Sequence, residues 1–283
     1  MKIRKPTVAN AFYAGTKAEL TEQIAECFTG PLGPGKVPKP VEHGPRKILG
    51  IVSPHAGYIY SGPVAAHGFS RLATDGLPEA FVILGPNHTG YGSGVSIMTE
   101  GSWETPLGEL PIDSTLAKQI QKATSIIDID EEAHAFEHSI EVQLPFIQFL
   151  YGDAAKFVPI CMMMQDLRTS REIAKAIIEQ SKDRDIFIIA SSDFTHYEPH
   201  ETANRKDKMA IDAITRLDDA ALNELGENSK VTMCGYGPIS VLMAAGNLVG
   251  GVKAELLTHK TSGDATGDKS AVVGYSSLVL LRD

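Results

Sequence analysis

Residues 47–62 read KILGIVSPHAGYIYSG, and this stretch decides the fold. Its apolar run, Ile48–Ser53, is followed at once by a Pro-His-Ala-Gly turn that carries His55. Three more runs of the same kind follow at residues 81–85, Phe157–Met162 and Ile186–Ser191. Continuous apolar runs are typical of strands that are buried on both faces of a sheet. The sequence therefore predicts four core strands.

Helix-like stretches alternate with these strands, which is typical of an α/β fold. They are predicted over residues 63–72, 114–122, 139–150 and 169–182, after an N-terminal helix over 16–28. We predict a single domain over residues 1–283, with a mixed, mostly parallel sheet covered by helices on both faces. Residues 94–113 are expected to form a hairpin excursion. The C-terminal third is expected to contain helices at 201–217, 219–225 and 237–245, then strands at 253–260 and 270–281 joined by a β-turn at 261–268.

Composition narrows the class of protein. The formal net charge is -9, which argues against nucleic-acid binding because nucleic-acid binders present basic faces. No apolar run reaches the length of about 20 residues that a membrane helix needs. The three cysteines include no CxxC pair, and the N-terminus lacks a signal-peptide core, so a reducing, cytoplasmic location is expected. Residues 261–268 lack the Lys-Ser/Thr ending of a P-loop, and no nucleotide cofactor is expected.

Two histidines and a cysteine are the candidate metal ligands. His55 and His88 each follow a strand, and each has a nearby proline and a glycine two residues later, which fixes an unusual loop path. Cys234 lies in MCGYGP, at the expected start of a helix, where the helix N-terminus would lower the thiol pKa. Two imidazoles and a thiolate would leave open positions for water or substrate, and they favour copper, zinc or iron(II) over magnesium. Cys27 and Cys161 are assigned to core packing.

Three more residues are candidate catalytic groups. Asp193 and His196 lie in SSDFTHY, where they could orient a ligand, act as acid or base, or cap the following helix. His138 lies in EHSIEVQLPF; on a helix it would share a face with Glu141, which would then orient it. His134 and His138 have the i, i+4 spacing of a zinc pair, but the HEXXH order is absent and we assign no second metal here.

Eight segments spread over nearly the whole chain carry a family resemblance. They are FYAG (12–15), PHAGYIYSG (54–62), LGPNHTG (84–90), WETPLGELPID (103–113), EHSIEVQLPF (137–146), SSDFTHY (191–197), MCGYGP (233–238) and GDKSAVVGYSSLVL (267–280). In this order they resemble the Memo-like protein family, named for a mediator of cell motility and also called AmmeMemoRadiSam system protein B.

The resemblance implies a fold similar to class III extradiol dioxygenases, which cleave catechol-type rings with non-haem iron(II). By that similarity His55 and His88 hold two ligand positions, and Cys234 stands where those enzymes place a carboxylate. Asp193 and His196 would then line the same pocket, with His138 near it as an acid or base.

The leading hypothesis is a metal-binding, dioxygenase-like redox protein that holds Fe2+ or Cu, with Zn less favoured. The alternative is a non-enzymatic protein that binds a peptide, a small ligand or a partner protein without turnover and keeps a vestigial active-site pocket; Tyr13, Tyr58 and Trp103 would suit that role. Zinc-dependent hydrolysis is a third hypothesis. The expected partner is a small molecule or peptide, with no nucleic acid and no membrane.

Overall fold

The computed structural model describes residues 2–283, and most of its strands belong to one large sheet. These strands are β2 (Ile48–Ser53), β3 (Ala80–Pro86), β4 (Val95–Ile97), β7 (Asp128–Ile129), β8 (Phe157–Met162), β9 (Ile186–Ser191), β10 (His196–Glu198), β11 (Val252–Thr261) and β12 (Val272–Arg282). Within the described residues the sheet has 9 strands in the order β10-β12-β2-β9-β3-β8-β4-β7, with β11 paired to β12. The central strands β2, β9, β3 and β8 are parallel, whereas β12 and β4 pair antiparallel to their neighbours. The predicted mixed sheet is confirmed.

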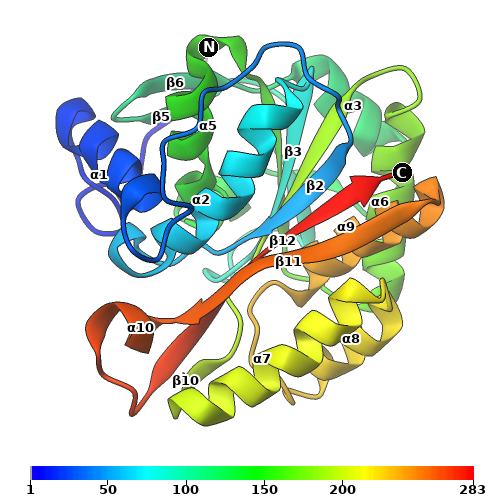
Figure 1. The fold of residues 1–283 in the computed structure, drawn as a ribbon. Helices are drawn as coiled ribbons and strands as arrows, with labels where there is room; N and C mark the ends of the chain where they lie inside the picture. The colour runs from blue at the N-terminus through cyan, green and yellow to red at the C-terminus, as the bar shows by residue number, and fades with distance from the viewer. Residues whose placement is uncertain (1) are drawn as a thin grey trace.

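Helices cover both faces of this sheet (Figure 1). One face carries α1 (Lys17–Thr29), α2 (Tyr58–Asp75), α5 (Leu144–Tyr151) and the short α10 (Ser262–Thr266). The other carries α3 (Ser114–Lys122), α6 (Leu167–Gln180), α7 (His200–Thr215), α8 (Asp219–Glu227) and α9 (Tyr236–Val249). The predicted α/β fold, with helices on both sides, is therefore confirmed.

A small sheet lies beside the large one. It joins β1 (Ile3–Arg4) to the hairpin of β5 (Ser102–Thr105) and β6 (Gly108–Pro111). The hairpin predicted within residues 94–113 is therefore present, although the first part of that segment forms β4 and joins the large sheet instead.

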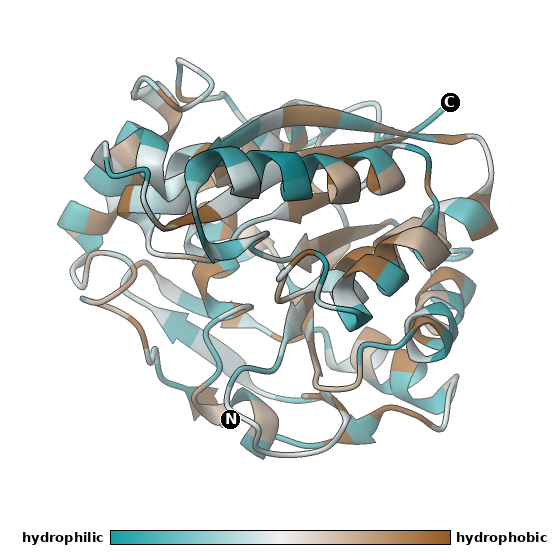
Figure 2. Ribbon diagram, turned by 90° about the horizontal axis from the view of Figure 1, so that it is seen from below, coloured by the Kyte–Doolittle hydropathy of each residue, from teal (hydrophilic) through white to brown (hydrophobic). Residues whose placement is uncertain are grey.

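The core is one continuous cluster of apolar side chains between the layers. Figure 2 shows the hydrophobic colouring concentrated in the central strands, with hydrophilic stretches on the outer helices. Phe146 stacks on Phe69, with ring centroids 4.7 Å apart. Cys27 and Cys161 are 4 % and 0 % exposed, as expected for core packing.

Two local predictions are wrong. Residues 139–150 are not one helix: a 3-10 turn at Glu141–Gln143 precedes α5, and Pro145 lies in the first turn of α5, where its missing backbone N–H costs no helical hydrogen bond. Residues 261–268 contain α10 rather than only a β-turn. There Thr261 caps the helix and Asp264 bonds back to it, which is a capping box.

Candidate metal centre

Loops at one edge of the sheet bring the candidate residues together. His55 follows β2, His88 follows β3 and Asp193 follows β9, and these three parallel strands are neighbours. The carboxyl ends of parallel strands meet at one edge of a sheet, where ligands bind in α/β folds. Cys234 reaches the same place from the loop that precedes α9.

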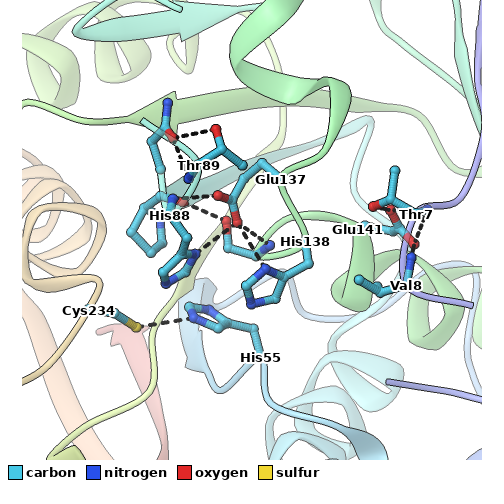
Figure 3. A network of polar contacts seen from close by, with 12 residues as sticks. Thr7, Val8, His55, His88, Thr89, Glu137, His138, Glu141 and Cys234 are labelled. Atoms are coloured by element: carbon cyan, nitrogen blue, oxygen red, sulfur yellow. Dashed lines mark hydrogen bonds and ion pairs between the residues drawn. The ribbon is translucent and has the colours of Figure 1, made fainter. Parts of the chain in front are cut away.

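His55, His88 and Cys234 form a group that could hold a metal ion (Figure 3). One ligand atom from each lies within 4.8 Å of the others, and Nε2 of His55 is 3.1 Å from Sγ of Cys234. Bonds of about 2.0–2.3 Å to a tetrahedral ion would separate such atoms by roughly 3.3–3.6 Å. The donor set therefore fits one ion after small side-chain movements.

Ser191 determines which ring nitrogen of His55 is free. Its hydroxyl donates to the carbonyl of Ser139 at 2.7 Å and accepts from Nε2 of Gln143 at 3.0 Å. Because a hydroxyl has one hydrogen, its 2.8 Å contact with Nδ1 of His55 requires the imidazole to donate. Nε2 of His55 then carries the lone pair, and it is this atom that faces Cys234.

Glu137 likewise determines which ring nitrogen of His88 is free, and it also lies beside His138. Its Oε1 accepts from Nδ1 of His88 at 2.9 Å and is 3.4 Å from Nδ1 of His138. Its Oε2 accepts from the backbone N–H of His88 at 2.5 Å. Burial alone would raise the pKa of Glu137, but the hydrogen bond and charges of the histidines lower it to about 2. Sequence reasoning missed this residue, although it directly precedes His138.

Glu141 does not orient His138, so that prediction is wrong. Its buried carboxylate binds Nη1 of Arg4 at 2.5 Å and accepts from the hydroxyl of Tyr13 at 2.6 Å. The expected helical face does not exist, because His138 lies in a loop and Glu141 begins a 3-10 turn. The contacts of Glu141 fasten the N-terminal segment to the domain instead.

The rings of His55, His88 and His138 are close together, with centroids 4.7–5.5 Å apart. Burial lowers the pKa of His138 to about 4, and burial followed by the neighbouring histidines lowers the pKa of His55. His88, Glu137 and His138 also form a compact group, but both oxygens of Glu137 already accept hydrogen bonds. We therefore treat this group as part of the same site.

Asp193 lies in the loop between β9 and β10, and His196 is the first residue of β10. Oδ1 of Asp193 accepts from the backbone N–H of His55 at 2.8 Å, and burial raises the pKa of this carboxyl to about 6. Nδ1 of His196 is 2.8 Å from the carbonyl of Thr232, to which it donates, and Nε2 is left free. Neither residue belongs to the group of possible ligands, but both line the adjoining cavity.

The environment of Cys234 differs from expectation. Burial, followed by the charge of Asp193, raises the pKa of its thiol well above the ordinary value. Burial therefore outweighs the lowering of the thiol pKa that is expected from the N-terminus of α9. The backbone N–H of Asp193, which donates to Sγ at 3.3 Å, does not reverse this balance. A bound metal ion would reverse the balance, because a coordinating thiol loses its proton.

A cavity of about 490 Å³ opens beside the ligand group. It is lined by His55, His88, His138, Asp193 and His196, which are five of the six predicted site residues. Its aromatic walls are Phe12, Tyr60, Tyr197 and Tyr275.

The aromatic residues predicted for this pocket do not line it. Tyr13, Tyr58 and Trp103 are 2 %, 3 % and 0 % exposed and belong to the core. Phe12 lines the cavity, whereas the adjacent Tyr13 is buried in the core, and the sequence pattern alone does not tell which of these two rings faces the cavity.

Comparison with known proteins identifies the family. Residues 4–279 match the family described as Memo-like protein. The chain belongs to this family. It is similar to MEMO1 family proteins of Methanopyrus kandleri (50% identical over 281 residues, 99% of each chain) and Methanothermobacter thermautotrophicus (47% over 278 residues, 98% of this chain and 99% of the relative). The expected Memo-like resemblance is therefore confirmed.

A solved structure shares the fold of this family member. The crystal structure of an uncharacterized protein from Escherichia coli K12 matches with a TM-score of 0.59, at 14% identity, over 82% of this chain and all of that one. Among residues 2–283, no helix combines the length and the apolar character that a bilayer crossing requires.

Proposed function

We propose that this protein binds a redox-active metal ion, iron(II) or copper, through His55, His88 and Cys234 and acts on a small molecule in the adjoining cavity. One observation carries the proposal, which is the convergence of three loops on one point. Nδ1 of each histidine is hydrogen-bonded to a neighbouring side chain, and one possible ligand atom from each of the three residues lies close to the other two. Two imidazoles and a thiolate suit iron, copper or zinc. The fold similarity to iron(II)-dependent dioxygenases that the family resemblance implies supports a redox-active ion rather than zinc.

Such an ion would supply redox chemistry and polarise a bound substrate. The chain's own residues would do the rest. Nδ1 of His138 is turned to Glu137, so Nε2 is the atom that gives or takes a proton in the cavity. His196 presents its free Nε2 in the same way, while the carboxylate of Asp193 holds the loop of His55 in place. The aromatic walls would offer a flat substrate rings to stack on.

A second candidate function is binding of a small molecule or peptide without turnover. It is favoured by aromatic side chains that line the cavity and remain accessible: Tyr197 is 79% exposed and Tyr60 is 37% exposed. Such amphipathic rings give large contact area at low entropic cost.

The test is metal analysis by mass spectrometry on anaerobically purified protein and four variants. His55→Ala and Cys234→Ser are expected to lose a near-stoichiometric metal. His67→Ala and Cys27→Ser, which lie outside the site, should retain it. Retention by His55→Ala would show that the ligand assignment is wrong.

A wild-type protein that takes up no added iron, copper or zinc would favour the second candidate. That candidate also predicts that ligand binding survives both chelation and Cys234→Ser.

A further inference from the structure

A buried carboxylate outside the metal centre joins three elements of the fold. Asp207, on α7, is 0% exposed. Its Oδ1 accepts from the backbone N–H of Thr195 at 2.9 Å, and its Oδ2 is 2.8 Å from Nε2 of His259 on β11. The three elements α7, β11 and β12 lie side by side in Figure 1.

The third element, β12, approaches the carboxylate closely at Gly274. A Cβ at this glycine would lie 1.8 Å from Oδ2 of Asp207, so only glycine leaves room. Gly274 also pairs with the loop that precedes β10: its N–H donates to the carbonyl of Thr195, and its carbonyl accepts from Phe194, both at 2.8 Å. Residues 193–196, which we call the site loop, are thus fastened by Asp207 on one side and by β12 on the other.

The site loop in turn contacts two of the three candidate ligands. The backbone N–H of Asp193 donates to Sγ of Cys234 at 3.3 Å, and the carboxylate of Asp193 accepts from the backbone of His55 at 2.8 Å. A hydrogen bond to a ligating sulfur changes the electronic properties of the metal as well as its geometry. A shift of the loop would therefore disturb both ligands at once.

We propose that Asp207 and His259 form a positioning pair that holds the site loop, and through it Cys234 and His55, in the geometry that a metal needs. The reason is electrostatic. A buried carboxylate is costly unless it is paired and hydrogen-bonded, so Asp207 stays in place only while His259 and Thr195 both bind it. Without His259, Oδ2 has no partner, and the carboxylate is drawn toward solvent together with the loop. This inference rests on the proposed function.

The experiment compares three variants. His259→Leu removes the donor to Asp207, and its side chain is accessible enough, at 17% exposed, for the change to be tolerated. His259→Gln keeps an N–H donor. His200→Leu is the matched control, since His200 makes a similar contact from α7 to Thr261 at 2.9 Å without touching the site loop.

Two readouts are used. The first is the rate at which iodoacetamide alkylates Cys234 in chelator-treated protein. Peptide mass spectrometry identifies which cysteine is alkylated, and Cys27 and Cys161 are buried and therefore protected from the reagent. The second is titration with Co²⁺, which reports affinity and the thiolate charge-transfer band. His259→Leu is expected to raise the alkylation rate, shift the band and weaken Co²⁺ binding by about tenfold, the lower end for residues that act through a ligand. His259→Gln should return the alkylation rate, the position of the band and the Co²⁺ affinity most of the way to the wild-type values, and His200→Leu should resemble wild type.

Three outcomes would overturn the inference. Unchanged alkylation and affinity in His259→Leu would show that the pair does not hold the loop. Equal losses in His259→Leu and His200→Leu would mean general destabilisation, and failure of His259→Gln to rescue would exclude the hydrogen bond as the cause. If wild type binds no Co²⁺ but alkylation still responds to His259→Leu, the proposed function fails while the positioning of the loop stands.

Discussion

Replacing Glu137 by glutamine tests whether this carboxylate prepares the histidines for metal binding. Its two oxygens accept from Nδ1 of His88 at 2.9 Å, from the backbone of His88 at 2.5 Å and from the backbone of Ser139 at 2.8 Å. Glutamine keeps one acceptor oxygen. In either orientation its amide N–H₂ faces at least one of these N–H donors, so a hydrogen bond is lost at a residue that is 0 % exposed.

The magnitude follows from that lost bond. A hydrogen bond to a charged group contributes about 1.5–3 kcal/mol. If the free energy of metal binding falls by that amount, the affinity for the metal falls about 10- to 100-fold, since about 1.4 kcal/mol is a factor of ten. This agrees with the loss of about 10- to 100-fold that is typical when the partner of a ligating histidine is removed.

Glu141→Gln is the matched control. Glu141 is another buried carboxylate four residues away, but it binds Arg4 and Tyr13 rather than the histidines of the site. Affinity is measured by Co²⁺ competition with a chromophoric chelator, and urea unfolding confirms that both variants are folded. If Glu137→Gln binds Co²⁺ as tightly as wild type, or if Glu141→Gln loses as much, the role assigned to Glu137 is refuted.

Three further predictions concern stability and are measured by urea unfolding. Gly274→Ala should lower the free energy of unfolding by about 1–3 kcal/mol, because the new Cβ would lie 1.8 Å from Oδ2 of Asp207; an unchanged midpoint would contradict this. Phe146→Ala should cost about 3–5 kcal/mol, since this side chain is 1 % exposed and stacked among other rings; a loss typical of a surface substitution would count against the packing described. For Asp113, burial raises the pKa, but hydrogen bonds from Arg184 and a backbone N–H outweigh burial and lower it overall. The whole stabilisation by this carboxylate is therefore present above the pKa of an unfolded aspartate, about pH 4. It is lost as the pH falls through the pKa of Asp113 in the folded protein, which is lower. Asp113→Asn should be less stable than wild type near neutral pH, with the difference shrinking in acid; a constant difference would argue against the ion pair.

The sequence by itself determined the strands and what stands at their ends. Continuous apolar runs such as Ile48–Ser53 have to be buried on both faces, and this requires a helix-covered sheet whatever the remainder of the chain does. Once the strands are parallel neighbours, His55, His88 and Asp193 meet at one edge because each directly follows its strand. Such information is local, and it is readable from the order of residues.

Only the tertiary structure decided which partners these side chains have. The spacing to His138 favours Glu141 as its partner, yet Glu137 is the carboxylate that binds His88, and Glu141 binds Arg4, 137 residues away in the chain. The thiol pKa of Cys234 was misjudged for the same reason, since burial outweighs the helix N-terminus that the sequence makes visible. Burial and hydrogen-bond partners depend on segments that are distant in sequence, and no periodicity within one segment records them.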